Sequence, residues 1–304
     1  MTLLKPAPGT VRTRRRRGLA ALPFLGPGGL YLAAMFVVPL VLITSYAFFQ
    51  RGRFGGIVWD FTLGNFARLL DPLYLGVVGN SLRVGFIVTL LALLLGYPMA
   101  LAITRLSPKW RTIALVAVLL PFWTNFLVRT YAWILLFNNA GWINQALQWL
   151  HITDKPIPML YTESAVVVGL LYIYLPLMIL PLYSSLASRD PQLGEAATNL
   201  GASPFRVFRT ITLPLSLPGV LTGCVFVFVP AMSNFIIPEL LGGGKTVLIG
   251  NLIRDQFLKA RDWPFGSTLA LVLTISLVVL LVAQAAVSRR LNEGKRIRET
   301  GTDA

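Results

Sequence analysis

Cysteine and histidine are almost absent from this chain. Its 304 residues include one cysteine, Cys224, and one histidine, His151. A single cysteine excludes any disulfide within the chain, and a zinc site built from cysteine and histidine lacks its usual three or four ligands. We therefore predict no metal site and expect both residues to serve ordinary packing or loop roles.

Charged residues are also scarce, at 13% of the chain against 55% hydrophobic residues. A soluble domain of average composition carries about 25% charged residues. Such a chain has too little polar surface to cover a large soluble enzyme. The formal net charge of +15 would suit nucleic-acid binding only if the basic residues formed one patch. They lie instead between long apolar runs, so no nucleic-acid partner is expected.

Long apolar runs are what the sequence does contain. Each is close to the roughly 20 residues that a helix needs to cross a bilayer, and helices satisfy their own backbone hydrogen bonds in lipid. The first run follows Arg14–Arg17, but it is longer than a signal-peptide core and no small-residue cleavage site follows it. The sequence predicts an all-α integral membrane protein with six transmembrane helices, at 22–48, 82–104, 112–137, 164–187, 214–238 and 267–288.

The basic residues between these runs predict the orientation. With the N-terminus inside, the inner segments hold seventeen lysines and arginines and the outer loops hold eight. The excess predicts that both termini lie in the cytoplasm. The outer loops, 49–81, 138–163 and 239–266, contain tryptophan, glycine, proline and amphipathic patches. They either form short interfacial helices that meet an external partner or are merely solvated caps.

The inner segment 189–214 carries the most informative spacing. Glu195-Ala196-Ala197 is followed by three residues, Gly201, nine residues and then Ile211-Thr212-Leu213-Pro214. Alanines favour a helix that a partner can approach closely, and Gly201 can end that helix in a left-handed conformation.

A second short helix is expected to follow. Ser203 before Pro204 is typical of a helix N-cap followed by proline at the first position. Arg206 and Arg209 then share one face, and Pro214 is placed to open the fifth membrane helix.

This spacing resembles the cytoplasmic loop of ABC import permeases. The resemblance implies the type I ABC importer permease fold, in which the loop docks as a short coupling helix on a separate ATP-binding subunit. It assigns the coupling role to Glu195, Ala196, Ala197, Gly201, Ser203, Arg206, Ile211, Leu213 and Pro214.

A possible phosphate-binding loop fails on inspection. Gly242-Gly243-Gly244-Lys245-Thr246 ends like a Walker motif, but Glu239 occupies the position where the first glycine is required. We therefore expect a transport subunit with no cofactor and no enzymatic role of its own, while ATP and Mg are bound by the partner ATPase.

Other stretches indicate a subgroup. Asn80-Ser81 resembles the start of the core that these ABC permeases share. Residues 120–133 and 238–266 are similar to the first of the two paired permeases of spermidine/putrescine polyamine transporters. The resemblance implies a multi-pass protein of the bacterial cytoplasmic (inner) membrane. Its implied partners are the lipid bilayer, a second and related permease, two ATP-binding subunits and an external solute-binding protein. Permeases for ferric iron, thiamine or other small solutes share parts of these stretches, so the solute stays open.

The resemblance also divides the chain. Residues 78–288 form the expected permease core of five transmembrane helices with the coupling loop. Residues 1–77 supply the basic cytoplasmic N-terminus, the first transmembrane helix and an outer loop, and 289–304 form a cytoplasmic tail.

A polycationic cargo would favour aromatic faces and a few carboxylates along its path. The positive charge of Arg129 would repel such a cargo, so we expect it to pair with Glu163 or Glu239, or to reach lipid headgroups. The aromatic residues have an alternative role in helix packing or in an interfacial belt. The candidate pathway residues are Trp123, Asn125, Arg129, Tyr131, Trp133, Tyr172, Tyr174, Asn234 and Glu239.

Two other classes fit poorly. A secondary transporter would need no coupling loop and would tend to show inverted repeats, which the sequence lacks. An intramembrane enzyme would need a nucleophile with a base, or facing carboxylates, and the apolar runs contain almost no acids.

Overall fold

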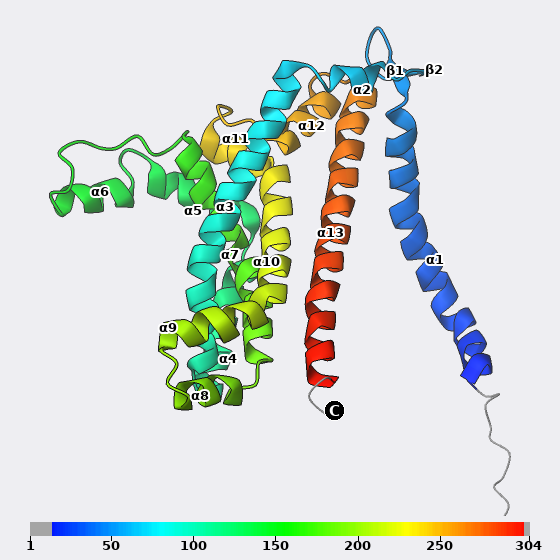
Figure 1. The fold of residues 1–304 in the computed structure, drawn as a ribbon. Helices are drawn as coiled ribbons and strands as arrows, with labels where there is room; N and C mark the ends of the chain where they lie inside the picture. The colour runs from blue at the N-terminus through cyan, green and yellow to red at the C-terminus, as the bar shows by residue number, and fades with distance from the viewer. Residues whose placement is uncertain (1–13, 301–304) are drawn as a thin grey trace, which may run out of the picture.

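The computed structural model describes the backbone of residues 14–300 and the side chains of residues 27–288. Most of this part is helical, and the long helices run roughly side by side (Figure 1). The elements, in chain order, are α1 Arg14–Tyr46, β1 Phe49–Arg51, β2 Ile57–Phe61, α2 Gly64–Arg68, α3 Pro72–Arg105, α4 Pro108–Leu119, the 3₁₀ turn η1 Leu120–Trp123, α5 Phe126–Phe137, α6 Trp142–Trp149, α7 Glu163–Ala187, α8 Gln192–Asn199, α9 Pro204–Val207, the π-helical turn η2 Phe208–Thr212, α10 Leu213–Ser233, α11 Ile236–Gly242, α12 Ile249–Leu258 and α13 Trp263–Thr300.

Five helices of the described part are long and apolar enough to cross a membrane, and a bent pair brings the total to as many as six. Continuous helices cover the apolar runs predicted at 82–104, 164–187 and 267–288. The first run is helical as far as Tyr46. Short helices lie within each of the outer loops.

The third apolar run is not one straight helix, so the prediction of one continuous helix over 112–137 is wrong. The chain breaks between η1 and α5, and the segments Pro108–Trp123 and Phe126–Trp149 meet at 92°. Thr124 is extended, and the Asn125 side chain accepts a hydrogen bond from the Leu127 amide at 2.8 Å. Asn125 is thus the N-cap of a new helix, which local capping chemistry favours over continuation.

The fifth span also differs from the prediction of 214–238. Helix α10 ends at Ser233, because Asn234 leaves the helical conformation and its side chain caps α11 by accepting from the Ile237 amide at 2.9 Å. At its N-terminal end, α10 begins at Leu213 with Pro214 in its first turn, close to the predicted start, and α9 and η2 continue the helical path back to Pro204.

Pro214 therefore lies inside a continuous helical segment. Proline lacks an N–H, and its ring would crowd the carbonyl four residues earlier, which belongs to Thr210. The π-helical turn η2 coincides with this position. Such wider turns relieve a local misfit without ending the helix.

The end of the bundle that the charge pattern predicts to face outward, named the outer end below, contains a small antiparallel hairpin of β1 and β2, which the prediction of an all-α fold missed. The segment Ile57–Phe61 is rich in β-branched and aromatic residues, as strands are. Arg51 donates from Nη2 to the Ala260 carbonyl at 2.6 Å, so the hairpin joins α1 to the start of α13.

An ion pair with a buried carboxylate strengthens this outer connection. Arg68 on α2 binds Asp262 at 2.8 Å, and the Asp262 side chain is 1% exposed. The Arg68 guanidinium also lies 4.0 Å from the centre of the Phe265 ring, within the range of a cation–π interaction. The outer ends of α1 and α13 are therefore held together by polar contacts outside the apolar spans.

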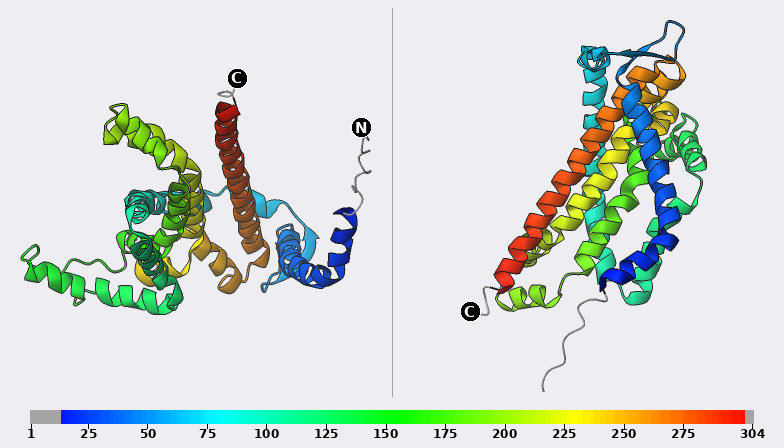
Figure 2. Two further views of the ribbon diagram at one scale, coloured as in Figure 1. Left: turned by 90° about the horizontal axis from the view of Figure 1, so that it is seen from below. Right: turned by 90° about the vertical axis from the view of Figure 1, so that its right-hand side faces the viewer.

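Helices α3, α7 and α10 form the packed centre, and the views in Figure 2 place them next to one another. Two glycines of α10 lie directly against α7. A Cβ atom added at Gly219 would lie 2.7 Å from the Pro181 carbonyl oxygen, and one at Gly223 would lie 2.6 Å from the Met178 sulfur. Small residues allow this close approach, which membrane helices need because lipid supplies no hydrophobic drive for association.

Substituting Gly219→Leu should therefore separate α7 from α10. The new side chain meets backbone that cannot rotate away, so the cost should reach the upper end of the roughly 1–3 kcal/mol typical of overpacking. The measurement is the thermal unfolding midpoint of the purified protein in detergent. Gly76→Leu is the matched control, because a Cβ at that exposed helical position meets nothing within 4 Å. Equal midpoints for the two variants would contradict this packing.

Candidate functional site

The inner loop between α7 and α10 folds into the two short helices that its sequence predicts. Gly201 has φ +84° and follows the C-cap of α8. Its amide donates to the Thr198 carbonyl at 2.9 Å, and the Ala202 amide donates to the Ala197 carbonyl at 3.0 Å. These two bonds form a Schellman motif, so the predicted left-handed ending at Gly201 is confirmed.

The start of the next helix also agrees with its sequence. Ser203 is the N-cap of α9, with its hydroxyl 3.4 Å from the Arg206 amide, and Pro204 occupies the first turn. The Ser203 cap and Gly201 together turn the chain sharply between α8 and α9. The remaining residues assigned to coupling, Ile211, Leu213 and Pro214, lie on the continuous segment that leads into α10.

Helix α8 has two different faces. One face lines a groove of about 550 Å³ at the inner end of the bundle, and Glu195 and Thr198 contribute to its wall. Arg105 of α3 and Arg189 line the same groove. The Arg189 guanidinium donates to the Thr212 hydroxyl. This bond connects the chain just after α7 to the end of η2, directly before α10.

The opposite face of α8 is apolar and exposed. Leu193 is 48% exposed and Leu200 is 89% exposed, with the exposed Ala196 between them. Residues seven apart lie on one helical face, so the spacing of Leu193 and Leu200 in the sequence already indicates this apolar face. A leucine this exposed at the membrane surface fits a contact with another protein.

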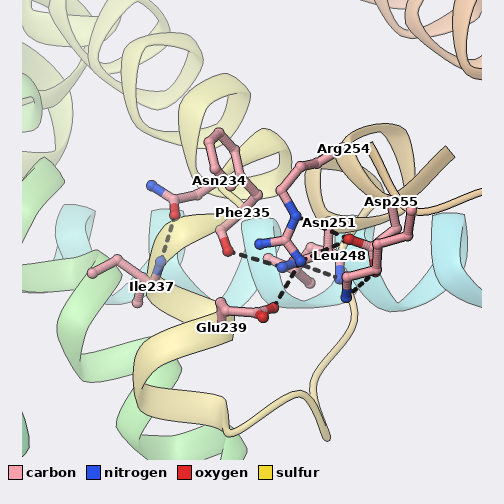
Figure 3. Close-up of polar contacts among 9 residues, drawn as sticks. Asn234, Phe235, Ile237, Glu239, Leu248, Asn251, Arg254 and Asp255 are labelled. Carbon is pink, nitrogen blue, oxygen red and sulfur yellow. Dashed lines mark hydrogen bonds and ion pairs between the residues drawn. The ribbon is translucent and has the colours of Figure 1, made fainter. Parts of the chain in front are cut away.

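The outer end holds a polar network among α10, α11 and α12 (Figure 3). Asn251 lies at its centre: its amide group donates to the Phe235 carbonyl at 2.8 Å, and its oxygen accepts from the Leu248 amide at 3.3 Å. Asn234, at the end of α10, donates from its side chain to the Tyr174 hydroxyl at 2.8 Å. Two asparagines therefore fix the chain where it leaves the membrane span.

Arg254 adds an ionic part to this network, as Figure 3 shows. Its guanidinium binds Glu239 at 2.9 Å and Asp255 at 2.7 Å, and Lys259 binds Asp255 at 3.0 Å. Partial burial acts to raise the pKa of Asp255, but the hydrogen bonds and charges of Arg254 and Lys259 hold that pKa below its ordinary value. Asp255 is therefore ionised at neutral pH and shares the guanidinium with Glu239.

Arg129 does not pair with either of the two expected acids. Glu163 forms an ion pair with Arg83, and Glu239 is bound by Arg254. Within the described residues, the Nε and Nη1 atoms of Arg129 are buried without a hydrogen-bond partner. The guanidinium lies 6.0 Å from the centre of the Phe122 ring. The pairing prediction failed because both acids have nearer cations on α3 and α12.

The aromatic candidates divide between the interior and the surface. Trp133 packs edge-on against Tyr172 with ring centres 5.5 Å apart. Trp123 is 79% exposed, and Tyr131 is also exposed. Asn125 serves as the N-cap of α5. The structure thus brings the pathway candidates together in pairs and does not gather them in one cluster.

The glycine triplet that resembled a phosphate loop has a structural role. Gly243, with φ +58°, ends α11, and the Lys245 amide closes a turn to the Gly242 carbonyl at 3.1 Å. A Cβ at Gly243 would overlap the Tyr161 ring. Glycine is therefore required here by backbone conformation and by close packing.

Comparisons with known proteins agree with this architecture. The family model described as "Binding-protein-dependent transport system inner membrane component" matches residues 89–293. The spermidine/putrescine transport system permease protein PotB of Escherichia coli is 43% identical over 263 residues, which cover 86% of this chain and 96% of the relative. The protein of the same name from Haemophilus influenzae is 40% identical and covers 86% and 92%.

A solved structure shares the fold. A chain of a bacterial ABC transporter involved in the import of the acidic polysaccharide alginate superposes with a TM-score of 0.70 at 18% sequence identity. The match covers 90% of this chain and 96% of that chain.

The chain therefore belongs to the family of binding-protein-dependent transport system inner membrane components. It is a multi-pass permease of the inner membrane and a transport subunit of an ABC importer, not a catalytic one. Membership implies that it works with an ATPase and a solute-binding protein.

The substitution Asn251→Ala should loosen the outer network. It leaves the buried Leu248 amide and the Phe235 carbonyl without their side-chain partner, at a cost of about 1–3 kcal/mol. Hydrogen–deuterium exchange should rise in the segment 234–251 and stay unchanged in α7. Asn80→Ala is the control, since that half-buried asparagine donates one solvent-exposed bond to the Val247 carbonyl in the same loop. Unchanged exchange in the Asn251 variant would show that the network does not hold the segment.

Proposed function

We propose that this chain is the permease through which a polyamine, spermidine or putrescine, enters the cell. The observation that carries the proposal is the 43% identity over 86% of the chain to a spermidine/putrescine permease. The similarity spans 263 residues, so it extends far beyond the coupling loop that many importers share.

The proposed topology is the type I importer fold with six spans and both termini in the cytoplasm. The basic residues of the inner segments support this orientation. The bent pair Pro108–Trp123 and Phe126–Trp149 then supplies the third span, with Pro108–Trp123 as its upright part. In this arrangement, residues 78–288 form the permease core, and residues 1–77 and 289–304 flank it.

The proposed assembly contains a second permease, and the polyamine resemblance favours a related but different chain. Two ATP-binding subunits carry ATP and Mg on the cytoplasmic side, and a solute-binding protein docks on the outer loops. The exposed leucines of α8 support the ATPase contact. ATP-driven closure of the two ATPase subunits would draw the inner loops together and open the pathway outward.

The proposed pathway uses aromatic faces more than fixed charges. Trp133, Tyr172 and Tyr174 are half-buried and pack against the hydrophobic core of the helix bundle. Glu239 is partly exposed at the outer end. Cation–π contacts suit a flexible polycation, because each is weak and can be exchanged along the path. Trp123, Tyr131, Asn125, Arg129 and Asn234 complete the proposed set, with Asn125 and Asn234 acting through the helix ends that they cap.

A different solute remains the alternative within this architecture. The putative 2-aminoethylphosphonate permease PhnU of Salmonella paratyphi A is 28% identical over 264 residues. Its lower identity than that of the polyamine permeases favours the polyamine assignment.

Uptake of radiolabelled spermidine tests the assignment. Deleting the gene in its host should abolish high-affinity uptake, and the wild-type chain supplied from a plasmid should restore it. A tenfold excess of unlabelled putrescine should compete, whereas thiamine, ferric citrate and 2-aminoethylphosphonate should not. Unchanged polyamine uptake after deletion would overturn the polyamine assignment while leaving the permease family intact.

The substitution Leu200→Asp tests the docking role of α8. A charge at this 89% exposed position should reduce copurification of the ATPase at least about tenfold. The reason is that removing the new carboxylate from water in an apolar contact costs more than about 1.4 kcal/mol, which corresponds to a tenfold loss of affinity. Gln192→Asp, an exposed change at the start of the same helix, should keep the ATPase bound. Full ATPase recovery with the Leu200 variant would exclude this face as the contact.

A further inference from the structure

Helices α5 and α6 form an arm that leaves the central bundle. The arm, Phe126–Trp149, lies at 92° to the preceding apolar segment Pro108–Trp123. Figure 1 shows α6 at the far end of this arm, away from α3, α7 and α10, and the view from below in Figure 2 shows the same projection. A helix perpendicular to an upright span runs parallel to the membrane plane.

Each helix of the arm carries a pair of exposed large apolar side chains. Val128 and Leu135 of α5 are 66% and 70% exposed, and Trp142 and Trp149 of α6 are 79% and 78% exposed. Residues seven apart within one helix lie on one face, so each pair shares a face of its own helix, and the non-helical residues 138–141 separate the two pairs. We name these four residues the arm stripe.

The other side of α6 is covered by its own chain. Asn144 is 1% exposed, and its side chain binds the Asn138 carbonyl and both the amide and the carbonyl of Ile157. These bonds hold the returning loop against α6. The polar groups of the inner face are therefore satisfied within the chain, and the arm stripe is the face left for a partner.

We propose that the arm stripe lies in the outer interface of the lipid bilayer, with the indole rings of Trp142 and Trp149 at headgroup depth. Tryptophan favours this position because its ring is apolar and its N–H is polar. The stripe continues from α5, part of the apolar bent pair, so the lipid-facing surface of a membrane protein extends directly onto α6. The proposal rests on the membrane location and is independent of the solute.

The composition of the arm favours lipid over a protein partner. Between residues 126 and 150, Arg129 is the one charged residue, whereas a surface that receives a soluble protein carries a polar and charged rim. Contacts between membrane helices favour small residues that let backbones approach, and the stripe has large ones. An interfacial helix places its apolar face about 5–10 Å into the boundary between headgroups and acyl chains.

Spin-label accessibility tests the proposal. The whole transporter is purified by an affinity tag on this chain and reconstituted in lipid nanodiscs. Cys224→Ser gives a background without cysteine, and Trp142→Cys and Trp149→Cys each receive one nitroxide label. Oxygen, which concentrates in lipid, should broaden both signals more than the water-soluble complex NiEDDA does. Phe54→Cys, 93% exposed in the outer hairpin, is the aqueous control, and Val279→Cys, 62% exposed on the apolar span of α13, is the lipid control.

The two sites should fall between the controls, nearer to Val279→Cys. NiEDDA accessibility as high as at Phe54→Cys would place the stripe in water and overturn the proposal in favour of a soluble partner. Low accessibility to both reagents would show that protein covers the stripe, which would overturn it in favour of a second permease. Neither outcome would bear on the polyamine assignment, which uptake measurements decide.

Discussion

Close contact among α3, α7 and α10 is the constraint on which the rest of the structure depends. Lipid is as apolar as the side chains of these helices, so burying those side chains contributes little free energy to helix association. Dispersion contacts between closely spaced backbones must supply the attraction, and they fall off within an ångström. Gly219 and Gly223 permit that spacing against α7, and Gly96 of α3 does the same where a Cβ would lie 3.0 Å from Met178. The same three helices carry the inner loop and the outer network, so both sites inherit their positions from this packing.

The continuous helical segment Pro204–Ser233 gives these two ends a mechanical connection. At 1.5 Å per residue, its 30 residues reach about 45 Å. One end begins at the Ser203 cap directly after α8, and the other ends at Asn234, which holds Tyr174 and α11. The segment turns between α9 and α10, as Figure 1 shows, and the π-helical turn η2 lies at this point, so the helical path continues past Pro214 without ending. Because this path is unbroken and is held by contacts at both ends, it is the most direct connection between the inner loop and the outer network.

The features predicted correctly from the sequence are those that neighbouring residues determine. Gly201 and Ser203 act within one helical turn, so their spacing was sufficient to predict the end of α8 and the start of α9. Hydropathy could not reveal the 92° bend, because it measures how apolar a segment is and not its direction. The Asn125 cap that causes the bend was present in the sequence but lay inside an apolar run. The pairing of Arg129 failed for a different reason: the partners of Glu163 and Glu239 are 80 and 15 residues distant from them in the chain.

The ion pairs at the outer end restrict how this chain can select a cation. Glu239, which belongs to the proposed path, and Glu163 each already bind an arginine, Arg254 and Arg83 respectively. Each pair joins one guanidinium nitrogen to one carboxylate oxygen, so a polyamine ammonium would meet a carboxylate whose negative charge is already balanced by an arginine. Selection by a free carboxylate of this chain is therefore disfavoured in the described conformation. The half-buried rings of Trp133 and Tyr172 carry no resident cation among the described contacts, and their negative faces attract any ammonium without requiring an exchange of partners. Under the proposed function, recognition of one particular polyamine falls to the solute-binding protein, and this chain has the less specific task of letting a positive, flexible molecule pass.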